Sequence, residues 1–121
     1  MRVWLPVTVE QIAAWQSGDD FTIVDGIAVT AQWASQFDDD DPEVLEDEAL
    51  QVAGTGIAVV VVEAPATVIN SETGSVRLDA PINKRQIQAF FAKSSLADED
   101  LLWFGPTEAL ELLDFVRGAG Q

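Results

Sequence analysis

The side chains of this chain that could do chemistry are mainly carboxylates, and they are concentrated in one segment. Eight of the eleven residues in segment 38–48 are acidic: Asp38, Asp39, Asp40, Asp41, Glu43, Glu46, Asp47 and Glu48. Their charges lie within a Debye length of one another, about 8 Å at physiological salt, and therefore act together. This acidic segment predicts a docking surface for a basic protein partner. The alternative is a solvated loop that leads into the start of a helix.

A divalent-cation site is a third interpretation of the acidic segment, but the pattern of a calcium-binding loop is missing. Such a loop needs a glycine at its turn and a closing glutamate at its twelfth position. Neither is present when the loop is started at Asp38 or Asp39. We therefore assign no metal site and no cofactor, and leave adventitious magnesium or calcium binding open.

The residue types that most enzymes use for acid–base or nucleophilic work are absent. The chain has no histidine, no cysteine and no tyrosine, which excludes disulfides, thiolate metal sites and histidine-based triads. We assign no catalytic residue and lean against an enzyme. The alternative is a carboxylate-dependent enzyme, optionally assisted by magnesium, that acts on a small molecule. Such an enzyme needs at least two converging, buried acids.

Two further motifs have ordinary structural interpretations. Asp98, Glu99 and Asp100 resemble a carboxylate cluster for acid–base work, but three consecutive acids before a strand are more typical of an exposed turn. The glycines in segment 54–56 lack the lysine that ends a phosphate-binding loop. We expect these small residues to let a helix approach a sheet closely.

Positive charge and tryptophan are the remaining candidates for binding. Lys84 and Arg85, with Arg77 nearby in sequence, are the one concentration of cations, and they predict either ion pairs with the acidic surface or a small anion pocket. The four tryptophans predict either core packing or a groove for a partner; they are Trp4, Trp15, Trp33 and Trp103. If the strands of Trp4 and Trp103 are neighbours, the two rings can pair on one face.

Composition restricts the partners and the location of the protein. The formal net charge is −15 over 121 residues, which disfavours direct binding to nucleic acid phosphates or to anionic membrane. The opening residues lack a secretory signal pattern. The longest apolar run, at 57–62, is far too short to span a bilayer. We expect a soluble, cytoplasmic protein, in which the charge could also serve solubility alone.

The local signals define most elements. Residues 2–6 predict a strand, and Thr8 with Gln11 forms a capping box that starts a helix, which Gly18 ends. The Asp25-Gly26 pair indicates either a hairpin turn or a kinked strand. Further expected elements are a short helical turn at 31–37, a helix from 42, strands at 65–71 and 75–78, a strand at 101–104, a helix from 107 with Leu110, Leu113 and Val116 as its apolar stripe, and a frayed end at 118–121. Periodicity leaves 57–62 and 86–94 undecided between helix and strand.

Three stretches of the chain resemble an uncharacterised family of short actinobacterial proteins, a domain of unknown function. They are the opening Met-Arg-Val-Trp-Leu-Pro with Thr8, the segment 26–30, and the closing Leu-Leu-Trp-Phe at 101–104. The family usually carries tyrosine where this chain has Trp4. The resemblance implies that 42 to about 62 is one helix and that 86–94 is a strand. It implies no activity.

Together these observations predict one α+β domain over residues 1–121. We expect a two-layer sandwich, in which a mixed sheet of four to five strands carries two to three helices on one face. The function that fits best is that of a non-enzymatic interaction or regulatory protein. Its acidic segment would bind a basic partner, in the manner of a DNA mimic. The sequence does not determine an oligomeric state.

Overall fold

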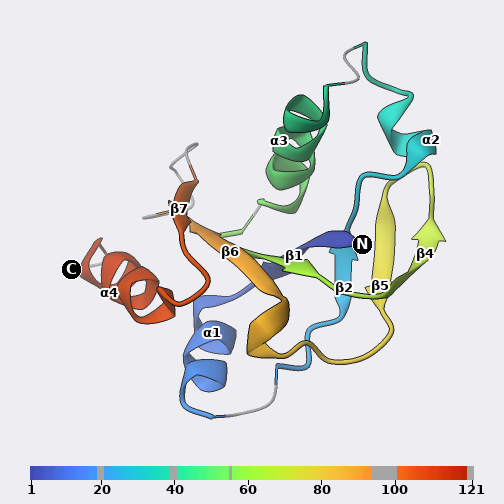
Figure 1. Cartoon of the computed structure of the whole chain (residues 1–121). Helices are drawn as coiled ribbons and strands as arrows, with labels where there is room; N and C mark the ends of the chain where they lie inside the picture. Colours follow the sequence, from blue (N-terminus) through green and yellow to red (C-terminus); the bar gives the residue numbers. More distant parts are fainter. Residues whose placement is uncertain (19–20, 39–40, 55, 94–100, 120–121) are drawn as a thin grey trace.

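The computed structural model describes residues 1–18, 21–38, 41–54, 56–93 and 101–119. Within these ranges, seven strands form one sheet in the order β4-β5-β2-β1-β3-β6-β7 (Figure 1). The strands are β1 (Arg2–Val7), β2 (Asp25–Ile27), β3 (Ala58–Glu63), β4 (Ala66–Asn70), β5 (Ser75–Leu78), β6 (Ile87–Ala92) and β7 (Leu102–Phe104). The helices are α1 (Val9–Gln16), α2 (Ala31–Ala34), α3 (Pro42–Ala53) and α4 (Ala109–Ala119), with a 3-10 turn η1 (Lys84–Gln86) before β6.

The centre of the sheet is the long antiparallel pair of β1 and β3. Six residue pairs join them, from Arg2 opposite Glu63 to Val7 opposite Ala58. Because successive side chains of a strand point to opposite faces, Val3 and Leu5 lie on one face of the sheet and Trp4 on the other. All three side chains are buried, so the centre of the sheet is covered on both faces.

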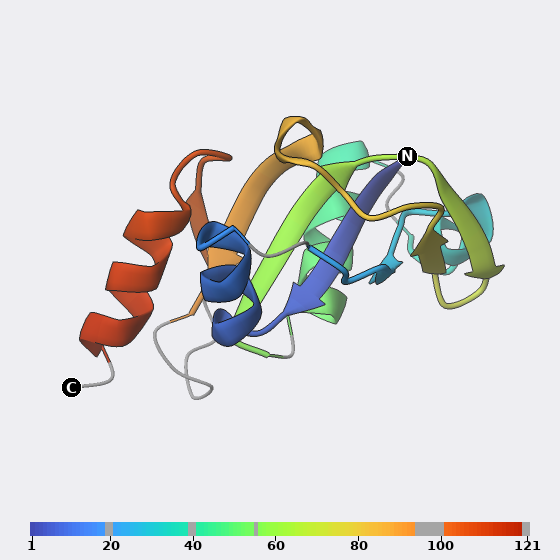
Figure 2. The same cartoon turned by 90° about the horizontal axis from the view of Figure 1, so that it is seen from below.

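Helices cover the two faces separately. Helices α1 and α4 pack together on one face (Figure 2), where Ile12 and Leu112 join the larger hydrophobic core. On the other face, α2 and α3 bury Trp33 and Leu45 against Trp4 in a smaller core. The expected two-layer sandwich with a mixed sheet of four to five strands and helices on one face is therefore wrong. The fold is α+β, but its sheet is entirely antiparallel, has seven described strands, and lies between two helical layers.

The capping box predicted for α1 is confirmed. The Gln11 amide donates to Thr8 Oγ1 at 3.1 Å, and the Thr8 amide donates to Gln11 Oε1 at 2.7 Å. Gly18 follows the helix with a φ of 111°, a left-handed conformation that glycine adopts without strain. The start and stop of α1 are therefore set by local chemistry.

The Asp25-Gly26 pair lies within a strand and not in a hairpin turn. Asp25 lies opposite Arg77 of β5, and Gly26 lies opposite Val76. A Cβ atom on Gly26 would lie 2.6 Å from Val3 Cγ1. The glycine therefore makes room for β1 side chains and does not serve a turn.

The segment from 42 to 62 is a helix followed by a strand, so the single helix implied by the family resemblance is wrong. Helix α3 ends at Ala53 with Gly54 as its C-cap, and β3 begins at Ala58. The run of β-branched valines is buried on both faces of the sheet, where β1 and β6 flank it. Such a run suits a central strand, because branched side chains pack well on a pleated surface. Of the strand implied at 86–94, Ile87–Ala92 is confirmed as β6, whereas Gln86 belongs to η1 and residue 94 lies outside the described residues.

The C-terminal helix is present, and two residues of its expected apolar stripe are confirmed, since Leu113 lies in the larger core and Val116 packs against it, but Leu110 does not belong to the stripe. Ala109, Leu112 and Leu113 are buried, whereas Leu110 is 57% exposed. Helix α4 extends to Ala119, so it includes two residues of the end expected to fray. In the part of the chain that the structure describes, no helix has the length and apolar character needed to cross a membrane.

Candidate functional site: an acidic groove between α3 and β6

The acidic segment forms the end of the α2–α3 connection and the first half of α3. Asp41 is the N-cap of α3, and its Oδ1 accepts a hydrogen bond from the Glu43 amide at 3.0 Å. Pro42 occupies the first helical position, as expected for a helix start. Asp39 and Asp40 lie outside the described residues.

The described acids of the segment point largely to solvent. Asp38, Asp41, Glu43 and Asp47 are exposed, and Glu46 and Glu48 are half-buried. Glu46 binds one of the protein's own cations, since Arg2 Nη1 lies 2.9 Å from Glu46 Oε1. Glu43 and Asp47 have no ion-pair partner among the described residues. The segment therefore keeps charge that faces outward.

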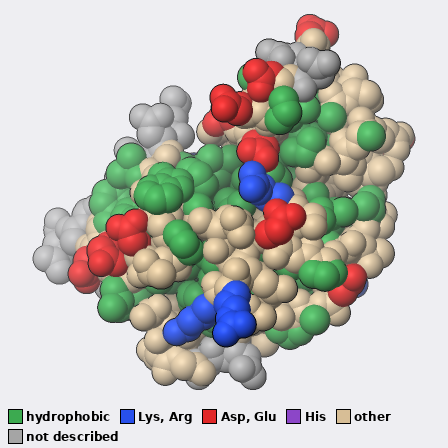
Figure 3. Space-filling view, in the orientation of Figure 1, with side chains coloured by type: hydrophobic (Ala, Val, Ile, Leu, Met, Phe, Trp, Pro, Cys, Tyr) green, Lys and Arg blue, Asp and Glu red, His purple; other side chains and the backbone are tan. Residues whose placement is uncertain are grey.

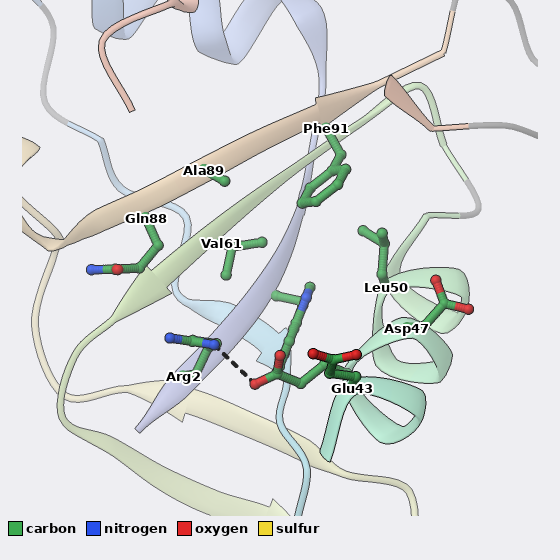
Figure 4. A pocket seen from close by; sticks show the side chains of 10 residues that line it. Arg2, Glu43, Asp47, Leu50, Val61, Gln88, Ala89 and Phe91 are labelled. Carbon is green, nitrogen blue, oxygen red and sulfur yellow. Dashed lines mark hydrogen bonds and ion pairs between the residues drawn. The ribbon is translucent and has the colours of Figure 1, made fainter. Parts of the chain in front are cut away.

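Helix α3 packs over β1 and β2 and leaves a groove between itself and β6. The groove has a volume of about 370 Å³. One wall is α3, which contributes Glu43, Asp47 and Leu50, and the floor is the sheet (Figure 4). The floor is mostly apolar and includes Val61 and Phe91. The full lining is Arg2, Trp4, Glu43, Glu46, Asp47, Leu50, Val61, Gln88, Ala89 and Phe91.

Arg2 forms a bridge across one end of this α3–β6 groove. Its guanidinium binds Glu46 on α3, and its Nε lies 3.6 Å from Glu63 Oε2 on β3. A second hollow, of about 380 Å³, shares Arg2, Trp4 and Glu46 with the groove. The groove lining carries three carboxylates and one guanidinium, so its formal charge is negative even with the bridge formed.

The apolar floor continues from Phe91 toward the edge of the sheet. Phe91 lies opposite Trp103 of β7, and the Trp103 side chain is 61% exposed. Figure 3 shows acidic side chains over α3 and hydrophobic side chains gathered beside them toward β7. Acidic and apolar surfaces are therefore adjacent on this face of the molecule.

The four tryptophans divide between core and surface. Trp4, Trp15 and Trp33 are buried in the two cores, as the core interpretation predicts. Trp103 is on an edge strand and is exposed. Trp4 and Trp103 do not pair, because β3 and β6 separate their strands.

The carboxylates of the described residues lie at the surface of the protein. Among the residues that the structure describes, no charged or polar side chain is buried. In the same residues, no group of three or more acids is placed to hold a metal ion. The cluster at 98–100 lies outside the described residues. The described groove can hold a cation or a basic side chain, but it lacks converging buried acids.

Sequence reasoning identified the acidic wall but missed most of the floor. Gln88, Ala89 and Phe91 belong to a segment whose helix-or-strand assignment was open, so no face could be assigned to them. The tryptophans were the one sequence signal for the floor, because Trp4 lines the α3–β6 groove. Of the cations, Lys84 and Arg85 do not ion-pair with the acidic segment in the described structure, and Arg77 binds Asp25 at 2.9 Å.

The comparisons with known proteins place the chain in a family without assigning it an activity. The chain belongs to a family of unknown function (DUF6912), whose model matches residues 1–100. The match covers the whole of the α3–β6 groove. No curated protein and no solved structure matches the chain.

Proposed function

We propose that this protein is a non-enzymatic, cytoplasmic interaction protein that binds a basic segment of a partner protein in the α3–β6 groove. The observation that carries the proposal is the outward-facing pair Glu43 and Asp47 beside an apolar floor. The partner's arginine or lysine side chains would meet these carboxylates. Asp38, Asp41, Glu46 and Glu48 would extend the negative surface around the groove, and Asp39 and Asp40 belong to the same acidic segment of the sequence.

The local charge of the groove supports a basic partner over a nucleic acid. Its lining has three carboxylates, and its one cation, Arg2, is paired with Glu46, whereas binding to phosphates needs basic residues. Helix α3 carries four acids and no basic residue. A surface that acts as a DNA mimic needs negative charge alone, whereas this groove also offers Phe91, Leu50 and Val61. We therefore propose an amphipathic basic peptide segment as the occupant.

The apolar floor would supply much of the affinity. Exposed ion pairs contribute only about 0–1 kcal/mol each, so charge alone gives weak binding. Aromatic side chains in a recess bury large apolar areas. Phe91 on the floor and Trp103 at the exposed edge would receive an apolar residue of the partner. The carboxylates would then accelerate encounter and select basic segments.

A peptide-display library gives a direct test. Peptides selected on the purified protein should be enriched in arginine and lysine interspersed with apolar residues. The strongest peptide is then synthesised with a fluorescent label, and its binding is measured by anisotropy at low and high salt. We expect the affinity to fall with salt, because the paired charges are exposed.

A matched pair of variants locates the binding. Glu43→Gln with Asp47→Asn removes two groove charges, and Glu111→Gln with Asp114→Asn removes two exposed charges of α4. Both double variants have the same net charge. The groove variant should bind the peptide several-fold more weakly than the α4 variant. Equal binding by the two variants, or selected peptides without basic bias, would overturn the proposal.

A further inference from the structure

Another pocket, separate from the groove and from the hollow beside it, lies on the opposite face of the sheet. It has a volume of about 380 Å³ and is formed where α1, η1 and the start of α4 meet. Its lining is Trp15, Gln16, Lys84, Arg85, Ile87, Pro106, Thr107 and Ala109. Two of the chain's six basic residues are therefore side by side at one hollow.

These two cations have no carboxylate partner among the described residues, although acids outnumber bases by 21 to 6 in the chain. Arg2 and Arg77, by contrast, both form ion pairs. Both Lys84 and Arg85 are exposed at the pocket. Because charges beyond about 8 Å are largely screened at physiological salt, the net charge of the whole chain acts only weakly here. The described acid nearest in sequence to the pocket lining is Glu108, which follows Thr107 and whose Oε1 accepts a hydrogen bond from the Gly105 amide at 2.6 Å.

Local hydrogen bonds fix the backbone of η1, which carries both cations. Asn83 caps η1, and its Oδ1 accepts a hydrogen bond from the Arg85 amide at 3.0 Å. The Asn83 amide donates to Gln86 Oε1 at 2.9 Å, which completes a capping box. Lys84 Nζ lies 5.8 Å from the centre of the Trp15 ring, within the range of a cation–π contact. The backbone positions of the two cations are therefore fixed, which lowers one part of the entropic cost of binding.

The other walls add a hydroxyl donor and apolar surface. Thr107 supplies the hydroxyl, and Ala109 is the first residue of α4, whose N-terminal amides favour negative charge. Trp15, Ile87 and Pro106 form apolar walls. A lone inorganic anion would leave most of this volume and apolar surface unused.

We propose that this η1–α4 pocket binds an organic phosphate monoester. The phosphoryl oxygens would lie against Lys84 and Arg85, since guanidinium and ammonium groups form strong charge-assisted hydrogen bonds with phosphate. The organic part would lie against Trp15 and Pro106. The site is separate from the α3–β6 groove and does not depend on the function proposed for it.

Phenyl phosphate is a suitable probe. Inorganic phosphate and phenol, which represent its two halves, serve as control ligands. Binding is followed by ¹⁵N-resolved NMR of the full chain, with the indole NH of Trp15 as reporter, in a buffer free of phosphate and sulfate. We expect saturable binding of phenyl phosphate that moves the Trp15 and Lys84 signals. Inorganic phosphate and phenol should each bind at least several-fold more weakly.

Two double variants of equal net charge separate the pocket from general charge effects. Lys84→Gln with Arg85→Gln should weaken phenyl phosphate binding about tenfold or more. Arg77→Gln with Lys93→Gln should leave it within twofold, because neither residue lines the pocket. The fold of each variant is checked by its NMR spectrum. Glu43→Gln with Asp47→Asn should leave this binding unchanged, which separates the outcome from that of the groove.

Several results would overturn the assignment. Absence of saturable binding at millimolar phenyl phosphate contradicts an anion site. Equal loss of binding in the two cation variants attributes it to net charge. Phenol that binds as tightly as phenyl phosphate removes the role of the phosphoryl group, and inorganic phosphate that binds as tightly removes the role of the organic part.

Discussion

Gly26 occupies a position where any side chain must displace the central strand, so Gly26→Ala should destabilise the protein strongly. A Cβ atom at this position would lie 2.6 Å from Val3 Cγ1, 2.8 Å from Leu5 Cδ2 and 2.8 Å from the Trp4 carbonyl oxygen. Ordinary van der Waals contacts begin near 3.4 Å. The Trp4 oxygen belongs to the backbone of β1 and has no rotamer with which to move away.

The magnitude follows from these overlaps. Overpacking a well-packed core costs about 1–3 kcal/mol when side chains can adjust. Here Val3 and Leu5 are completely buried and a backbone atom is also involved, so we expect about 2–3 kcal/mol. For a domain of this size, that loss lowers Tm by about 10 °C. The measurement is thermal unfolding by circular dichroism, with urea denaturation at 25 °C as a second determination.

Gly56→Ala is the matched control. No heavy atom lies within 4 Å of a Cβ atom built on Gly56, and its φ is outside the left-handed region. Alanine there should leave stability unchanged or raise it by less than about 1 kcal/mol, because it restricts the unfolded chain. If Gly26→Ala had the same Tm as the control, the close approach of β2 to β1 would be refuted.

Three further changes test the larger core, the cap of α1 and the exposed edge of the sheet. Phe90→Ala empties a fully buried position and should cost about 3–5 kcal/mol in urea denaturation; a loss under 1 kcal/mol would contradict its place in the core. Thr8→Ala removes the α1 cap and should cost about 1 kcal/mol, whereas Thr8→Ser should restore most of it; equal stability of the two variants would deny the cap. Trp103→Ala, at an exposed side chain, should change stability by less than about 0.5 kcal/mol while weakening the peptide selected for the α3–β6 groove in the anisotropy assay, and unchanged peptide binding would remove Trp103 from that site.

The fold brings charged side chains together at two separate places on the protein. The acidic segment forms one wall of the α3–β6 groove, while Lys84 and Arg85 lie at the η1–α4 pocket on the other face. Arg2 is bound by Glu46 and Glu63 and stabilises the contact of α3 with the sheet. Carboxylates therefore gather at the α3–β6 groove, and two cations gather at the η1–α4 pocket, on opposite faces of the sheet.

The local signals of the sequence determined several elements correctly. Thr8, Gln11 and Gly18 define the ends of α1, because capping hydrogen bonds and a left-handed glycine involve only neighbouring residues. Asp41 and Pro42 define the start of α3 for the same reason. The outward-facing charge of the acidic segment could also be predicted, since consecutive acids without nearby cations stay in water.

Only the tertiary structure decided the nature of the central strands and the shape of the site. The valines of β3 suit a buried helix or a buried strand equally well until β1 and β6 are known to flank them. Gly26 has the sequence signature of a turn, but its neighbours across the sheet determine its place in a strand. The groove is lined by residues of three strands and one helix that are distant in the chain. Such contacts are set by which strands pair, and strand pairing depends on the burial of both sheet faces together, which no local pattern records.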